Sequence, residues 1–397
     1  MKNVLFGWAL SLLSTTAFAA PQGSGARNMA MGGVGVASSH HSAAGFTNPA
    51  LLSHFASTDD ISLVAPFFEG VVADGDQLLD GVERFQNTLT EIQTLLEMGD
   101  LANADALRPV LAQDLLSLDG RALDGGLSTG LSVSLPSDGF ALAVVVRGYV
   151  DGQAFPIIDP ADVDIITDPF GTPTDLDNLG SEAVVLAAGV QEVGLTVSHK
   201  FEVRGRPLSV GITPKVQRVE TFNYAVSLQS FDNTAALDDF TDGIYRQDET
   251  NVNIDLGVAF EPIPFLTVGL AAQDLVGQEI DTVVTGGRSF SYELGPRLIG
   301  GVAFRGAFFT AALDADLLKK ARFDRADDTR AIRAGAEFDA FGWLKVRAGI
   351  SHDLEDTRAD LFSAGVGLAP FRVFNLDLVG VLGEDSAGGG LQISITI

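Results

Sequence analysis

Short runs in which apolar and polar residues alternate are the feature that most limits how this chain can fold. The last nine residues, Gly389 to Ile397, place leucine and isoleucine on one side and glutamine, serine and threonine on the other. Residues 253–260 and 344–351 alternate in the same way. A period of two predicts β-strands with one apolar face, and a final segment of this kind is typical of the closing strand of a barrel.

The first 20 residues differ from the rest of the chain and have the pattern of an export signal. One lysine precedes an apolar run from Val4 to Leu13, and Ala17 and Ala19 follow, which predicts cleavage near Ala19 or Ala20. The alternative, a membrane anchor, needs about 20 apolar residues. No such run occurs later, although 46% of the residues are hydrophobic. Apolarity spread this thinly predicts an all-β transmembrane β-barrel in a bacterial outer membrane, whose strands show every second residue to lipid.

The candidate strands number about 14, and the connections between them alternate between short and long. We expect strands near residues 61–69, 127–135, 139–149, 183–201, 207–219, 250–261, 265–274, 296–305, 307–317, 329–339, 343–352, 361–369, 373–382 and 389–397. Short turns in the periplasm and long loops outside are typical of outer-membrane barrels. A soluble sandwich shows the same alternation, but it gives no reason for connections to be sorted by length.

One long connection, residues 76–119, has a helical pattern. Its apolar residues recur every three or four positions in two stretches, which are separated by Gly99 and Asp100. We therefore predict a helical hairpin inserted into the barrel. Its apolar stripes either pack against each other and the barrel rim, or form a mobile cap over the pore mouth.

The composition excludes several classes of function. The chain has no cysteine, which excludes disulfides and thiol chemistry. Its net charge of −27 opposes nucleic-acid binding, because that affinity comes largely from lysine and arginine. The aspartate-rich residues 151–182 could collect Ca²⁺, but their four prolines fit no recognised cation loop, so we favour a solvated acidic loop. Neither a catalytic constellation nor metal-ligand spacing stands out, and we expect no enzyme, cofactor or metal site.

Six ionisable residues lie on the polar faces of the predicted strands. Because a charge on the lipid face is costly, we expect these residues to face the lumen. There they either line a water path or pair across a filled interior. They are Asp255, Arg333, Glu337, Asp339, Lys345 and Arg347.

Two N-terminal segments carry a family resemblance. Residues 21–37, PQGSGARNMAMGGVGVA, and residues 48–52, NPALL, resemble the mature start of the FadL long-chain fatty-acid transporters. The acidic helical insert and residues 189–195 resemble more closely the barrel-type conjugal transfer protein TraF family, which is related to FadL.

The resemblance implies a barrel over residues 57–397, which includes the insert at 76–119, and a hatch formed by residues 21–56 inside the lumen. Glycines permit close backbone packing in a narrow lumen, and proline keeps the preceding residue extended. The alternative for this segment is a flexible linker. The hatch residues implied by the resemblance are Arg27, Gly32, Gly33, Asn48, Pro49 and Ala50.

The resulting hypothesis is a passive, gated outer-membrane channel for small hydrophobic molecules. We expect the solute to be captured by apolar residues of an outer loop, namely Phe155, Ile157 and Ile158. Movement of the hatch would then release it. The expected partners are outer-membrane lipid, lipopolysaccharide, a hydrophobic small-molecule ligand and envelope proteins, but not nucleic acid. One alternative is a non-transporting envelope component of a conjugal transfer or other surface assembly. Another is a soluble periplasmic binding module.

Overall fold

Fourteen antiparallel strands close into one barrel in the computed structural model, which describes residues 24–229, 243–371 and 373–397. The expected export signal and its cleavage site lie outside the described residues. Around the barrel the strands follow chain order, except that β7 is followed by β10, and β16 pairs with β1. Their bounds are β1 Ser62–Ala73, β2 Leu123–Leu135, β3 Ala141–Ile157, β4 Glu182–Val203, β5 Arg206–Ser227, β6 Arg246–Ile263, β7 Leu266–Gln273, β10 Arg297–Arg305, β11 Phe309–Asp316, β12 Ala331–Ala340, β13 Leu344–Asp353, β14 Leu361–Leu368, β15 Phe374–Gly383 and β16 Ser386–Thr396.

The closed barrel confirms the predicted fold and excludes the sandwich. Every expected strand is present, and tight turns alternate with longer loops as predicted up to β15. The prediction is wrong for the last connection, residues 383–388, because β16 begins at Ser386 and only Glu384 and Asp385 separate it from β15. Along β6, Leu256 and Val258 are exposed on the outer face, whereas Asp255 is buried on the inner face. Phe341 and Trp343 are exposed beside one of the tight turns, where the polar headgroups of a bilayer favour aromatic rings. We call this the tight-turn end of the barrel and the opposite end the outer end.

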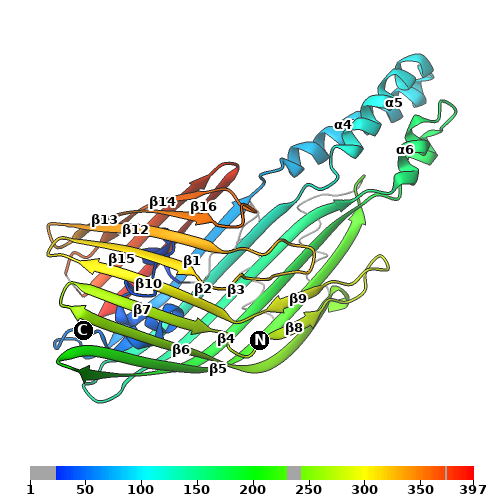
Figure 1. The fold of residues 1–397 in the computed structure, drawn as a ribbon. Coiled ribbons are helices and arrows are strands. Elements are labelled where there is room, and N and C mark those ends of the chain that lie inside the picture. The colour runs from blue at the N-terminus through cyan, green and yellow to red at the C-terminus, as the bar shows by residue number, and fades with distance from the viewer. Residues whose placement is uncertain (1–23, 230–242, 372) are drawn as a thin grey trace.

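The barrel is taller on one side than on the other (Figure 1). β4 and β5 each span 22 residues, whereas β7 and β11 each span 8. About 10 residues suffice to cross a bilayer, so the tall strands continue beyond it at the outer end. β3 and β5 extend past their predicted ends at 149 and 219. The alternation of apolar and polar residues ends at these predicted ends, because beyond them the outer faces of the strands no longer contact lipid.

The insert forms the predicted helical hairpin, with α4 at Leu78–Met98 and α5 at Leu101–Leu116. Their apolar stripes pack against each other and against α6, Pro160–Thr167, and α7, Pro173–Leu176. Figure 1 shows this helical arm rising away from the barrel rim, so the self-packed arrangement is present and a cap across the mouth is not. None of the described helices has the length and apolarity of a membrane span.

Residues 24–56, which we call the N-terminal segment, lie inside the barrel near its tight-turn end (Figure 1). The segment contains four short helices that pack on the inner faces of the strands. Their bounds are α2 Ala26–Met29, η1 His41–Ala43, α3 Ala44–Thr47 and η2 Pro49–Ser53. Most residues from Ala26 to Ser53 are buried, so the alternative of a flexible linker is wrong for them.

A small second sheet folds inside the long connection between β7 and β10. β8, Gln278–Asp281, pairs with β9, Ser291–Leu294. Residues 320–324 run beside β9, where the backbone N–H of Glu293 donates to the carbonyl of Arg322 at 2.8 Å. We name β8, β9 and residues 320–324 the outer cap. The sequence does not predict it, because strands of four residues are too short to show a period.

Candidate functional site: a lumen cavity and its two closures

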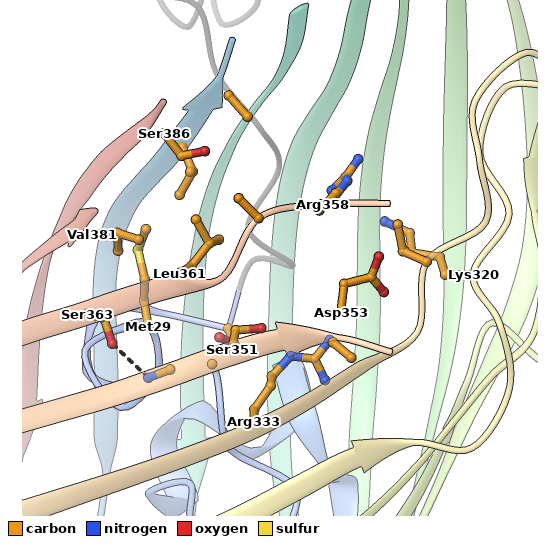
Figure 2. A pocket seen from close by; sticks show the side chains of 18 of the residues that line it. Met29, Lys320, Arg333, Ser351, Asp353, Arg358, Leu361, Ser363, Val381 and Ser386 are labelled. Carbon is orange, nitrogen blue, oxygen red and sulfur yellow. Dashed lines mark hydrogen bonds between the residues drawn. The ribbon is translucent and has the colours of Figure 1, made fainter. Parts of the chain in front are cut away.

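A cavity of about 310 Å³ lies in the lumen on the outer side of the N-terminal segment (Figure 2). Met29 and Val36 of that segment border it, Arg333 and Leu361 belong to its walls, and Lys320 comes from a long outer loop. This volume is at the lower end of the range for small-molecule sites. The lumen therefore holds one site of molecular size between the segment and the outer loops.

Asn48 fixes the turn that the family resemblance singles out. Its side-chain N–H groups donate to the carbonyls of Val36 at 2.7 Å and Val258 at 3.1 Å, and its Oδ1 accepts from the backbone N–H of Ala50 at 3.0 Å. Pro49 follows at the first position of η2, where no N–H is needed. One fully buried side chain thus starts the helix, ties two parts of the segment together and attaches both to β6.

Glycines occupy the wall at the points where the backbone of the N-terminal segment lies closest to it. A Cβ at Gly335 would lie 2.6 Å from the Cβ of Met31, and one at Gly349 would lie 2.7 Å from the Cα of Gly32. Real Cβ atoms essentially never approach this closely. Glycines on three further strands would overlap the segment in the same way, and on a fourth strand a Cβ at Gly301 would lie 3.1 Å from the Cβ of Val36. Together these positions form what we call the glycine belt. The belt comprises Gly211, Gly257, Gly269, Gly301, Gly335 and Gly349.

Gly32 also needs a backbone conformation that other residues rarely adopt. Its φ is 75°, and that of Gly33 is 88°. The two glycines turn the chain directly against β13, and Gly32 donates its N–H to Ser363 Oγ of the neighbouring β14 at 2.9 Å. The close approach and the left-handed turn both explain why glycine stands at these positions.

Arg27 joins the N-terminal segment to the charged inner face near the tight-turn end. Its Nε lies 3.1 Å from Glu337 Oε2, and Arg347 reaches the same carboxylate at 2.7 Å and Asp377 at 2.7 Å. Arg27 also donates to the carbonyl of Ser38 at 3.0 Å. Arg27, predicted as a hatch residue, therefore meets Glu337 and Arg347, which were predicted separately as lumen-facing charges.

The other named charges lie on the same inward face. Arg333 pairs with Asp316 at 2.8 Å, on the outer side of the segment. Asp339 and Lys345 stand directly opposite each other on β12 and β13.

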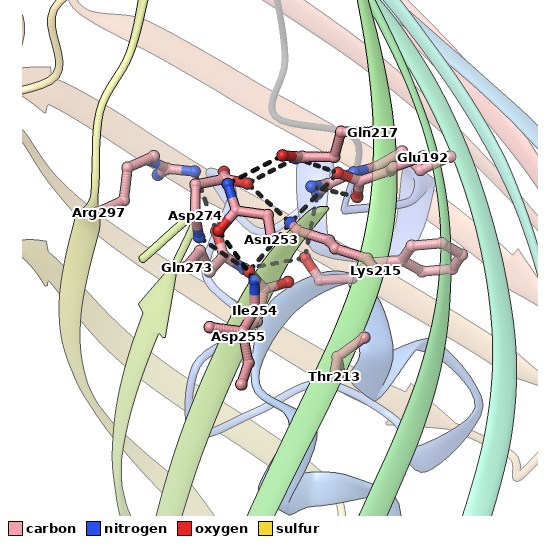
Figure 3. A network of polar contacts seen from close by, with 12 residues as sticks. Glu192, Thr213, Lys215, Gln217, Asn253, Ile254, Asp255, Gln273, Asp274 and Arg297 are labelled. Atoms are coloured by element: carbon pink, nitrogen blue, oxygen red, sulfur yellow. Dashed lines mark hydrogen bonds and ion pairs between the residues drawn. The ribbon is translucent and has the colours of Figure 1, made fainter. Parts of the chain in front are cut away.

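A second charge network lies on the opposite wall (Figure 3). Lys215 Nζ is within 3.2 Å of Glu192, Asp255 and Asp274, all of them buried. The neighbouring Gln273 donates to the carbonyl of Thr47 in the N-terminal segment at 2.9 Å. Of this network, only Asp255 was predicted from the sequence to face the lumen. The others could have been found as charges on the inward faces of predicted strands.

The outer cap closes the tall side of the barrel with large side chains. Tyr292 and Phe323 are fully buried, with ring centroids 5.1 Å apart, and they pack on inward residues of β4 such as Leu186. Asn223 of β5 donates to the carbonyls of Val283 and Arg288, both at 2.9 Å, in the connection between β8 and β9. The cap therefore has an apolar core of its own.

One arginine ties the cap to the barrel wall. Arg322 donates through Nε to Asp151 Oδ2 at 2.7 Å and through Nη1 to Asp124 Oδ1 at 2.6 Å, and its Nη2 binds Asp151 as well. The side chains of Arg322 and Asp151 are 2% and 1% exposed. Beside them, burial lowers the pKa of Lys320 to about 8, although Asp151 opposes this shift.

The expected capture residues do not form an open mouth. Phe155 is buried beneath the cap against Phe290, with the guanidinium of Arg325 4.4 Å from its ring centroid. Ile157 and Ile158 border a separate outer depression.

The acidic residues 151–182 act as caps and turns within the fold. Asp162 accepts from the backbone N–H groups of Gly180 and Ser181, both at 2.7 Å, and Asp159 accepts from that of Ala161 at 2.9 Å. Within the described part of the chain, no group of three or more acidic or histidine side chains is arranged to hold a metal ion. The interpretation as a merely solvated loop is therefore wrong for Asp162, which is buried.

Several solved structures with a similar fold are transporters or channels for hydrocarbons. The toluene transporter TbuX of Ralstonia pickettii aligns with a TM-score of 0.55 and 11% identity, covering 94% of this chain and 97% of that one. The toluene transporter TodX of Pseudomonas putida gives 0.53 and 13%, covering 96% and 98%. A FadL homologue of Pseudomonas aeruginosa gives 0.52 and 13%, covering 96% and 99%. At these identities the likeness establishes the fold, that of an outer-membrane β-barrel.

Comparison at the level of sequence gives a family. A search of curated proteins gives no match. Residues 45–316 match the profile of the family described as "F plasmid transfer operon, TraF, protein". This match confirms the resemblance found in the sequence. Because it covers more than half of the chain, this protein belongs to that TraF family.

Proposed function

We propose that this protein is a passive outer-membrane channel for small hydrophobic molecules, with the N-terminal segment as its hatch. The observation that carries the proposal is a cavity of about 310 Å³ between this segment and the outer loops. The fold shared with toluene transporters supports it. A solute reaches the cavity from the outer rim, and its release requires the segment to move, because the segment lies between the cavity and the tight-turn end.

The absence of cysteine allows a direct test of hatch movement. Ser53 Oγ of η2 and Ser209 Oγ of β5 are 2.9 Å apart, so Ser53→Cys with Ser209→Cys places two sulfurs where a disulfide can form. Thr196→Cys with Thr213→Cys is the matched control, since these side chains also lie 2.9 Å apart but join two wall strands.

Uptake of labelled octanoate into proteoliposomes is the measurement. The oxidised Ser53/Ser209 pair should block uptake and reduction should restore it, while the control pair should take up octanoate in both states. Unchanged uptake by the oxidised Ser53/Ser209 pair would show that the hatch does not gate. Uptake by the native protein no faster than by empty liposomes would exclude transport.

A second candidate is a non-transporting component of a transfer assembly, and the helical arm favours it. The tip of the arm exposes Met98 and Leu101, at 68% and 60%, on an acidic hairpin that rises above the rim. The family description names a transfer operon. Deleting residues 78–116 should then lower conjugal transfer frequency while octanoate uptake persists. An unchanged transfer frequency would exclude this role for the arm.

A further inference from the structure

The turn between β4 and β5, at the tight-turn end of the barrel, has an arginine where turn geometry does not favour one. Arg204 and Gly205 join the two strands, and their φ values are 53° and 71°. A two-residue turn with positive φ at both positions usually carries asparagine, aspartate or glycine, because larger side chains are strained there. The turn alone does not explain Arg204, and strain of this kind points to a function.

A second arginine lies on the lipid-facing side of the same turn. Arg206 stands opposite Val203, and the next pair on that face is Leu208 opposite Phe201. Val203 and Phe201 are 43% and 47% exposed, whereas Ser209, on the alternate face, is fully buried in the lumen. The alternation therefore places Arg206 outside the barrel, at the edge of the surface that contacts acyl chains.

Neither arginine is paired within the described part of the chain. Both are exposed, and none of the ion pairs or side-chain hydrogen bonds among the described residues involves them. Lys200 and Glu202 occupy the alternate positions of β4, on the lumen side, where their opposite charges offset each other. At the outer end, by contrast, the exposed Arg218 pairs with Asp248 at 3.1 Å. The outward edge of this turn is thus a positive surface on a chain whose net charge is −27.

We propose that the β4–β5 turn binds anionic phospholipid in the periplasmic leaflet of the outer membrane. Arg204 and Arg206 bind the headgroup phosphate, and the acyl chains lie against Phe201 and Val203. Short turns of outer-membrane barrels face the periplasm, and arginine binds phosphate through charge-assisted hydrogen bonds that are often bidentate. The apolar side chains on the same face favour a lipid over a soluble anion or the cell wall, because neither of those has acyl chains to cover them.

Quenching of a tryptophan at this turn by brominated lipids tests the proposal. Phe201→Trp combined with Trp343→Phe makes position 201 the only tryptophan of residues 24–397. The purified protein is reconstituted into phosphatidylcholine bilayers that contain brominated phosphatidylglycerol or brominated phosphatidylcholine. Phosphatidylglycerol should associate with position 201 about fivefold more strongly than phosphatidylcholine. This preference should largely disappear in 1 M salt, where the Debye length is about 3 Å.

Three variants of the arginines sharpen the test. Arg204→Gln with Arg206→Gln should remove the preference, whereas Arg204→Lys with Arg206→Lys should keep most of it. Arg204→Asn separates binding from folding, because asparagine is favoured at positive φ. It should preserve or raise the unfolding temperature and still weaken the lipid preference about threefold.

Two controls match the charge and the location. Lys200→Gln removes one positive charge from the same hairpin, but on the lumen side, and should leave the preference at position 201 unchanged. Without the two tryptophan substitutions, Trp343 reports on another tight turn, where Asp339 stands opposite Lys345. Quenching there should show no preference for the anionic lipid.

Any of four results would overturn the lipid site. The first three are equal quenching by both lipids at position 201, a preference that persists without the two arginines, and an equal loss in Lys200→Gln. The fourth is sedimentation of the protein with purified peptidoglycan that the double glutamine variant loses, which would assign the arginines to the cell wall instead. The turn is not part of the cavity lining, so these results leave the proposed channel untouched.

Discussion

The N-terminal segment and the outer cap both fill the lumen, but they contact the wall in opposite ways. The segment places backbone against the glycine belt, as where Gly32 meets Gly349. The cap inserts large side chains such as Tyr292 and fixes them with Arg322. Contact between backbones leaves no side chain free to adjust, whereas a side-chain core can repack. We therefore expect the segment to tolerate change at its contacts far less than the cap does.

The largest effect should come from adding a side chain to the glycine belt. Gly349→Val would overlap the backbone of Gly32 and should cost about 3 kcal/mol or more, or expel the segment and open the lumen. Thermal unfolding and single-channel conductance measure the two results. Gly380→Val is the control, since a Cβ at Gly380 meets nothing within 4 Å. Equal behaviour of the two variants would contradict the close contact.

A smaller and more local effect is expected at the cap. Arg322→Gln leaves the buried carboxylate of Asp151 without its main partner, which should cost about 3 kcal/mol of local stability. Hydrogen exchange should quicken in β9 and residues 320–324, while the glycine belt stays protected. The exposed Lys319→Gln should change neither region. Equal exchange throughout the lumen would mean that the two closures are not independent.

Asn48 tests a buried polar anchor of the N-terminal segment. Asn48→Ala removes a helix cap and two hydrogen bonds to backbone carbonyls, and should cost about 1–2 kcal/mol. Faster hydrogen exchange in residues 48–53 measures it. Asn103→Ala in the exposed arm removes an asparagine outside the lumen and should leave this region unchanged. Protection that survives Asn48→Ala would assign the anchoring to the glycine belt and to the remaining contacts, such as that between Ser53 and Ser209.

The smallest effect is a pH dependence beside the cap. Burial and the nearby Arg297, Arg322 and Arg358 lower the pKa of Lys320 from 10.5 to about 8, while Asp151 opposes them. A lysine whose pKa is lowered in the folded protein binds fewer protons there than in the unfolded chain, so the stability around Lys320 should rise as the pH goes from 8 to 10. Hydrogen exchange in residues 320–324 at pH 8 and 10, corrected for the intrinsic exchange rate, measures this rise, which Lys320→Gln should abolish. A rise that persists in Lys320→Gln would assign the pH dependence to another group.

The fold could be predicted much further than the site. The alternation in β6 and β13 follows from lipid on one side of the strand and lumen on the other, so each residue reports its own surroundings. The lumen contacts carry no such local signal. The sequence placed Glu337 and Arg347 on the inner face, but it did not bring Arg27 to them. It also named Phe155 as a point of capture, whereas the unpredicted cap buries that side chain.

The sequence by itself determined the 14 barrel strands, their order, most of the connections between them and the helical arm, because these depend on periodicity along a few neighbouring residues. Only the tertiary structure decided what the lumen contains. Arg322 and Asp151 are 171 positions apart, and Gly32 meets Gly349 only after the barrel has closed around the segment. Such contacts depend on strand register and on the curvature of the closed sheet, which no local pattern encodes.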